Sequence, residues 1–166
     1  MIKRNIHFKS KDVMVRLYKS LVRPRLEYCV QAWSPHLRKN IDRIERVQRR
    51  ATRLIEGYHE LSYEERLEKT GLIPLEKRRV RGDLIEVFKI NKGFEKVDFN
   101  RFFEISNVEK TRGHSYKIAK KRCNGERRRN FFSQRVVNGW NRLPQDVVDA
   151  ESVNCFKNRL DKLNYY

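Results

Sequence analysis

The stretch from Ser34 to Gly57 most constrains the fold, because it has the pattern of one long helix with two different faces. Ser34 is a favourable N-cap, Pro35 suits the first helical position, and Gly57 suits a left-handed residue after the last turn. Apolar residues recur at steps of three and four, which places on one face Leu37, Ile41, Ile44, Ala51, Ile55 and Tyr58. Basic residues fall roughly opposite: Lys39, Arg46, Arg49, Arg50 and Arg53. We therefore predict a helix over 35–55 with a protein core behind it and an anion in front of it.

Further helices are predicted on both sides of this segment, up to about residue 93. A first helix has Val13, Leu17 and Leu21 on one face, and Pro24 ends or interrupts it. Ser62 and Glu65 have the spacing of a capping box, which predicts a short helix over 63–70 that stops at Gly71. Pro74 then opens another helix ending near Gly93, with a shared face made by Val80, Leu84, Val87 and Phe88.

The composition changes after residue 93, which suggests a division into 1–93 and 94–166. The second part is strongly basic and less regular, and Asn124-Gly125 is a turn signal compatible with one short β-hairpin. Two more helices are expected, over 130–141 and 152–163, the latter capped by Ser152 and burying Phe156, Leu160 and Leu163. The predicted fold class is mainly α, a helical bundle followed by an irregular basic region.

The charge of the chain limits the classes of partner that it is expected to bind. Its 166 residues contain 39 Lys and Arg against 21 Asp and Glu, a formal net charge of +18. Such an excess is typical of proteins that bind nucleic acid or an anionic membrane, and a merely solvated basic surface is the alternative. The sequence contains no apolar run long enough to span a membrane. We favour nucleic acid, because aromatic residues are interleaved with the basic ones, and expect no membrane partner.

The N-terminal segment and the cysteines indicate where the chain resides. Charges occur throughout the first dozen residues, which is unlike a secretory signal. The three cysteines, Cys29, Cys123 and Cys155, are odd in number and far apart, which is typical of reduced thiols, with Cys29 expected in the core. We expect a nuclear or cytoplasmic protein that is not secreted.

The candidate nucleic-acid-binding residues form two clusters and several additions. The first cluster is the arginine face of the long helix, and the second lies between residues 110 and 135. The full set is Arg46, Arg49, Arg50, Arg53, Arg78, Arg79, Arg112, His114, Lys117, Lys120, Lys121, Arg122, Arg127, Arg128 and Arg129. Aromatic residues within or beside the second cluster could stack on bases if exposed: His114, Tyr116, Phe131 and Trp140. For Phe131 and Trp140, core packing is the stronger interpretation.

Catalytic patterns are missing from the sequence. It has no paired carboxylates for two Mg²⁺ ions, no phosphate-binding Gly-rich loop and no nucleophile elbow. Its four histidines have no metal-ligand spacing with one another or with the cysteines. We therefore expect a non-enzyme without metal or cofactor.

Six blocks, taken together and in order, resemble one known family. They are LYKSLVRPRLEYCVQAWSP (17–35), RIERVQRRATRLI (43–55), LSYEERL (61–67), LEKRRVRGDLI (75–85), TRGHS (111–115) and NFFSQRVVNGWNRLP (130–144). The chain resembles the C-terminal part of the reverse transcriptase of jockey-type, LINE-class non-LTR retrotransposons over nearly its whole length.

This resemblance implies a fold and a function. Residues up to about 93 would form the thumb, a helical bundle that grips the template–primer duplex behind a polymerase active site. The family's catalytic Ala-Asp-Asp block is not in this sequence, so the resemblance implies a fragment of an RNA-directed DNA polymerase without its chemistry. Two alternatives stay open: a subunit that completes a reverse transcriptase by pairing with a separate palm, and a remnant that binds another protein.

Overall fold

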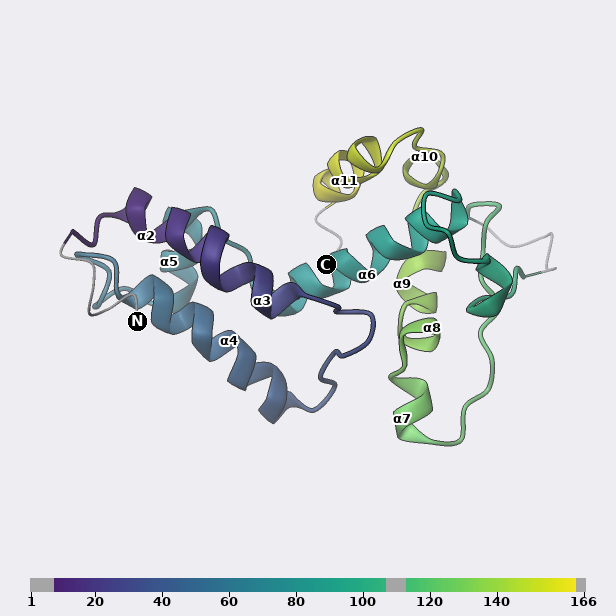
Figure 1. Cartoon of the computed structure of the whole chain (residues 1–166), viewed down its shortest axis with the longest axis horizontal. Coiled ribbons are helices and arrows are strands. Elements are labelled where there is room, and N and C mark those ends of the chain that lie inside the picture. Colours follow the sequence, from purple (N-terminus) through teal and green to yellow (C-terminus); the bar gives the residue numbers. More distant parts are fainter. Residues whose placement is uncertain (1–7, 107–112, 164–166) are drawn as a thin grey trace. The chain divides into compact units, whose positions relative to one another are not determined.

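The computed structural model describes residues 8–106 and 113–163, and the chain is mainly helical, as predicted (Figure 1). It divides into two compact units, the first ending at Arg79 and the second beginning at Val80. The division lies inside a helix, ahead of the boundary near residue 93 that composition suggests. We refer to the parts as unit 1 and unit 2, and describe each by itself.

The described part of unit 1 contains first three helical segments in direct succession, α2 (Lys11–Leu17), η1 (Tyr18–Val22) and α3 (Arg23–Glu27). Of the two outcomes expected at Pro24, an end or an interruption of the helix, the structure has the second, and Pro24 stands in the first turn of α3, where its missing N–H costs nothing. The segment before it, η1, is a π-helical turn. The buried residues are Met14 and Tyr18, so the predicted face was wrong: Val13 and Leu21 are exposed.

Helix α4 (Arg38–Arg53) is the long helix predicted from the sequence, but it starts later than expected. Leu37, with an extended ψ of 128°, is its N-cap, so Ser34 and Pro35 lie outside it. The preceding segment is held by other contacts, because Trp33 Nε1 donates to the Tyr28 carbonyl at 2.7 Å. Beyond the helix, Gly57 has the predicted left-handed φ, at +77°.

Helix α5 (Tyr63–Thr70) confirms the prediction at both ends. The Ser62 hydroxyl accepts from the Glu65 amide at 3.2 Å, and the Glu65 carboxylate accepts from the Ser62 amide at 2.7 Å. Gly71 closes the helix with a φ of +61°. Helix α6 (Leu75–Asn91) follows and contributes its first residues to unit 1 and the remainder to unit 2.

The interior of unit 1 contains a polar network beside a small apolar cluster of Tyr18, Tyr63, Leu67 and Leu72. Gln48 of α4 is fully buried; its Oε1 accepts from the Tyr18 hydroxyl at 2.7 Å, and its Nε2 donates to the Tyr63 hydroxyl at 2.9 Å. Glu45, one turn earlier, accepts from the Tyr63 hydroxyl and from the Leu75 amide. One network therefore joins η1, α4, α5 and the start of α6. Because these polar residues occupy the inner face of α4, the expected apolar face is only partly right: Ile55 is buried, Ile41, Ile44, Ala51 and Tyr58 are half-buried, and Leu37 is exposed.

Unit 2 is built from the rest of α6 and short helices: η2 (Phe99–Arg101), α7 (Glu126–Arg129), α8 (Phe132–Arg135), α9 (Val137–Asn141), α10 (Gln145–Val148) and α11 (Val153–Lys162). Its core is apolar and contains several aromatic rings, with Phe88 of α6 stacked on Phe156 of α11 at 4.3 Å between ring centroids. Leu84, Val87 and Trp140 are buried in the same cluster.

Three expectations about unit 2 need correction. The helix expected over 130–141 starts later, at Phe132, because Asn130 ends α7, and it is divided at Val136 into α8 and α9. Leu163 is exposed, although Ser152 caps α11 and Phe156 and Leu160 are buried as predicted. On α6, Val80 is exposed.

The β-hairpin does not form within residues 113–163. Gly125 has an ordinary φ of −97° and is the N-cap of α7, so Asn124-Gly125 makes no hairpin turn. Ile118 instead forms an isolated antiparallel bridge with Ile105, which precedes it in the chain.

Candidate nucleic-acid interface

The outer face of α4 carries a row of exposed arginines: Arg46, Arg49, Arg50 and Arg53. The row faces solvent because Glu45, Gln48 and Thr52 occupy the inner face of the same helix. Together with Leu54 and Arg66, the four arginines line a surface hollow of about 490 Å³, which we call the arginine hollow. The predicted first cluster is thus gathered at one place.

The positive charge of the arginine hollow is not neutralised by the acids of its own helix. Asp42 forms an ion pair with Arg38 at 3.2 Å, and Glu45 is held in the interior network. The Arg49 guanidinium lies 4.6 Å from the centre of the Tyr63 ring, a cation–π contact that orients it. Several guanidinium groups around one hollow are suited to phosphate oxygens, which they can bind in a bidentate manner.

Arg66, at the side of this hollow, was not predicted as a site residue. It is buried, its Nη1 donates to the Leu61 carbonyl at 2.8 Å, and its Nε has no hydrogen-bond partner among the described residues. No sequence pattern predicts this role, because the position of Arg66 depends on the packing of α5 against α4.

Two predicted phosphate-binding residues, Arg78 and Arg79, bind the protein itself. Arg78 forms a bidentate ion pair with Glu27, in which Nη2 lies 2.8 Å from Oε2. Arg79 is only 4% exposed; it donates to the Leu26 and Trp33 carbonyls and stacks on the Trp33 ring at 3.9 Å. Their contacts stabilise unit 1.

His114 also lies in an interior. Its Nδ1 accepts from the Tyr116 amide at 3.2 Å, and its Nε2 lies 2.9 Å from the Trp140 carbonyl oxygen, where it donates. Burial lowers the pKa of His114 below its ordinary value, partly offset by the hydrogen bond to Trp140. A neutral, buried imidazole is not placed to stack on a base.

The lysines of the second cluster have mixed surroundings. Lys120 donates to Asn138 Oδ1 at 3.1 Å, and Lys121 forms an exposed ion pair with Glu104 at 3.0 Å. Lys117 is half-buried and Arg122 is exposed, while Arg112 lies outside the described residues. Such exposed pairs contribute little free energy, so a phosphate can compete for the lysine.

The three arginines Arg127, Arg128 and Arg129 form most of the short helix α7 and are all exposed. Arg128 lies over the ring of Phe131 at 5.6 Å. Phe131 is exposed, contrary to the favoured expectation, whereas Trp140 is fully buried in agreement with it. Tyr116 is partly exposed, with Lys92 at 5.3 Å from its ring centre.

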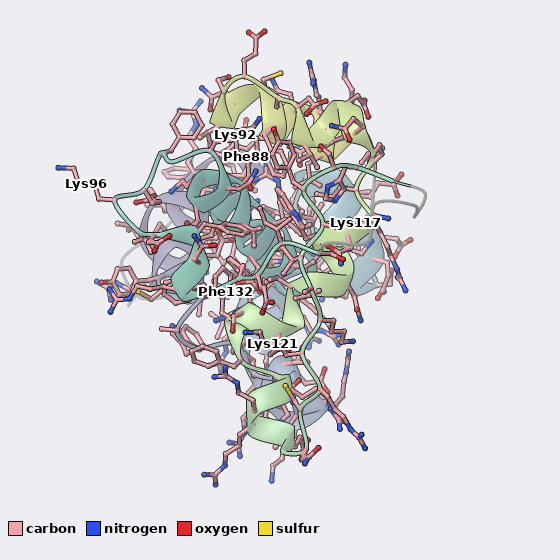
Figure 2. The ribbon with its side chains drawn as sticks, turned by 90° about the vertical axis from the view of Figure 1, so that its right-hand side faces the viewer. Phe88, Lys92, Lys96, Lys117, Lys121 and Phe132 are labelled. Carbon is pink, nitrogen blue, oxygen red and sulfur yellow. The ribbon has the colours of Figure 1, made fainter. Side chains whose placement is uncertain are left out.

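The extended segment before α7 runs alongside α7 to α9, and Figure 2 labels Lys121 on it and Phe132 at the start of α8 (Figures 1 and 2). Between the segment and these helices lies a second surface hollow of about 490 Å³, which we call the amide hollow. Cations line it, among them Lys120, Lys121, Arg122 and Arg129, together with three amide side chains, Asn130, Gln134 and Asn138. The amides were not predicted, although they recur at every fourth position along 130–138.

The described residues do not include a group of three or more His, Cys, Asp or Glu side chains that could hold a metal ion. Cys29 is exposed rather than buried, with a left-handed φ of +50° in the turn after α3. No helix within 8–106 or 113–163 is long and apolar enough to cross a membrane.

Comparison with protein-family models, with curated proteins and with solved structures found no match for the chain.

Proposed function

We propose that the chain is a non-catalytic nucleic-acid-binding module that grips a template–primer duplex through its phosphates. We propose further that it corresponds to the C-terminal part of a non-LTR retrotransposon reverse transcriptase. The arginine hollow carries the proposal, because its four exposed arginines share one helical face while the two acids of α4 have partners elsewhere. The assignment to a polymerase rests on the six sequence blocks.

The mechanism is electrostatic. Each arginine or lysine that reaches a phosphate releases condensed counterions, so affinity falls steeply as salt concentration rises. Contacts of this kind hold the duplex without reading its sequence. The exposed arginines of α7 provide a second set of phosphate contacts on unit 2.

A second candidate is a protein-interaction module, whether as a remnant or as a subunit that completes a reverse transcriptase with a separate palm. Large apolar residues of unit 1 are exposed, among them Leu21, Tyr28 at 73% exposure and Leu37. Exposed apolar residues favour a protein partner where they form a continuous patch. Binding to such a partner would depend little on the arginine row.

A salt titration with two double variants tests the first proposal. Arg46→Ala with Arg50→Ala removes two charges from the arginine hollow, and Lys11→Ala with Arg16→Ala removes two exposed charges from α2 as the matched control. We expect the slope of log K against log salt to flatten by about two in the first variant and to change little in the control. Binding to a labelled duplex is measured by fluorescence anisotropy.

Equal slopes in the two double variants would contradict the proposal. The chain would then respond to net charge alone, as a solvated basic surface does. Salt-independent binding of the unaltered chain would also contradict it.

A further inference from the structure

The two hollows have different chemistry, although their volumes are similar. The arginine hollow offers guanidinium groups and one leucine side chain, a set suited to phosphate alone. The amide hollow combines cations with three carboxamide side chains. Carboxamides carry a donor and an acceptor side by side, and this pair matches the hydrogen-bonding edge of a nucleobase.

Hydrogen-bonding groups remain available at two of these amides. Asn130 uses its Nδ2 to donate to the Glu126 carbonyl at 3.0 Å, which leaves its Oδ1 to accept. Asn138 uses its Oδ1 to accept from Lys120 at 3.1 Å, which leaves its Nδ2 to donate. The hollow therefore presents one acceptor from the residue that ends α7 and one donor from α9.

Gln134 lies between them in the sequence and is only 7% exposed. Its Oε1 is buried and has no hydrogen-bond partner in the described part of the chain. A buried acceptor without a donor costs free energy, and a donor entering the hollow would recover it. A purely structural residue at this position would be expected to be apolar or fully hydrogen-bonded.

We propose that the amide hollow binds one unpaired nucleotide of a single strand, with the base against the amides and the neighbouring phosphates against Lys121, Arg122 and Arg129. Its volume lies within the roughly 300–1,000 Å³ typical of small-molecule sites. A base in a duplex has its Watson–Crick edge occupied and its faces stacked, so only an unpaired base can enter. Arginine guanidinium planes can also stack on the base. The inference rests on the proposed nucleic-acid binding and adds a preference for single strands at unit 2.

Three labelled probes of equal phosphate number separate base contacts from phosphate contacts. They are a single strand, an abasic strand in which sugars and phosphates remain but bases are removed, and a hairpin duplex. The full chain should bind the base-bearing single strand about tenfold more tightly than the abasic strand, the effect of one good set of base contacts.

Gln134→Met keeps the shape of the side chain and removes the orphan acceptor. We expect it to reduce the ratio of the two affinities to near one without lowering the melting temperature, whereas the loss of a structural hydrogen bond would lower it. Asn138→Ala provides a second variant at an exposed position. Arg122→Ala is the control; it should weaken binding to both strands equally and reduce the salt slope by about one.

Equal affinity of the unaltered chain for base-bearing and abasic strands would overturn the inference, as would an unchanged affinity ratio in both amide variants. A steep salt slope in those same titrations would leave the proposed function standing. The absence of salt-dependent binding to all three probes would overturn both.

Discussion

The two units of the chain bury different chemistry. Unit 1 is organised around Gln48, whose carboxamide joins two tyrosine hydroxyls and the Ile73 carbonyl. Unit 2 is organised around aromatic rings, with Phe156 stacked on Phe88 and Trp140 fully enclosed. Both units present basic residues to solvent, so the same surface chemistry is supported by two kinds of interior.

The difference shows what each interior fixes. Hydrogen bonds are directional, so the network of unit 1 sets the rotation of α4 and turns its arginine row outward. Ring packing is less directional, and unit 2 assembles short helices around a large apolar cluster. We expect the stability of unit 1 to depend most on its hydrogen-bond partners, and the stability of unit 2 to depend most on the volume of its buried side chains.

The largest expected effect is the loss of an aromatic ring from unit 2. Phe156→Ala should lower the free energy of unfolding by about 3–5 kcal/mol, because the side chain is fully buried and stacked on Phe88. Urea denaturation followed by circular dichroism measures this. Leu163→Ala, at an exposed position of the same C-terminal segment, should cost well under about 1 kcal/mol. Similar losses for the two would show that Phe156 is not part of a well-packed core.

A smaller effect is expected when the centre of unit 1 is made apolar. Gln48→Leu leaves the hydroxyls of Tyr18 and Tyr63 without their carboxamide partner and should cost about 2–3 kcal/mol. Thr52→Val is the matched control on the same buried face. The Thr52 hydroxyl only donates to carbonyls of its own helix, so its loss should cost less than about 1 kcal/mol. If both variants lost the same stability, the network would not be what organises unit 1.

The sequence alone predicts the structure correctly where the signal lies within a few neighbouring residues. The capping box at Ser62 and Glu65 and the left-handed Gly71 lie within one short helix, so their pattern predicts both ends of α5. The outward arginines of α4 follow from periodicity in the same way. The inner face does not, because Glu45 and Gln48 are polar and find their partners 15 to 30 residues away in the chain.

Charge was a poor guide to function at residues whose partners are distant. Arg79 and His114 look like phosphate and base contacts in sequence, yet the first stacks on Trp33 and the second bonds the Trp140 carbonyl. The opposite error concerns Asn130, Gln134 and Asn138, which look like ordinary helix-surface amides and line a hollow. Both errors have the same cause: the surroundings of these residues are set by segments that pack together in three dimensions but share no sequence pattern.

The smallest expected effect is a pH dependence of the stability of unit 2, which contains the buried His114. Burial lowers the folded-state pKa of His114, and Lys117 adds to this, while the Trp140 carbonyl and Asp149 act in the opposite direction. As pH falls below about 6.5, the unfolded chain binds a proton at His114 before the folded chain does. Stability supplied by the neutral imidazole is therefore present above that pH and is lost progressively below it.

The unfolding free energy of the unaltered protein is compared with that of His114→Gln at each pH. The comparison is needed because carboxylates elsewhere also titrate as pH falls, and they do so in both proteins. The glutamine variant should be less stable at neutral pH, since it loses the edge-to-face contact with Trp140 at 5.6 Å. The difference in unfolding free energy between the two proteins should then shrink between pH 7 and pH 5. A Trp33→Phe background leaves Trp140 as the only tryptophan, so its fluorescence reports the unfolding of unit 2. Parallel stability curves over this range would mean that the pKa of His114 is the same in the folded and the unfolded chain. The pH response of unit 2 would then have another origin.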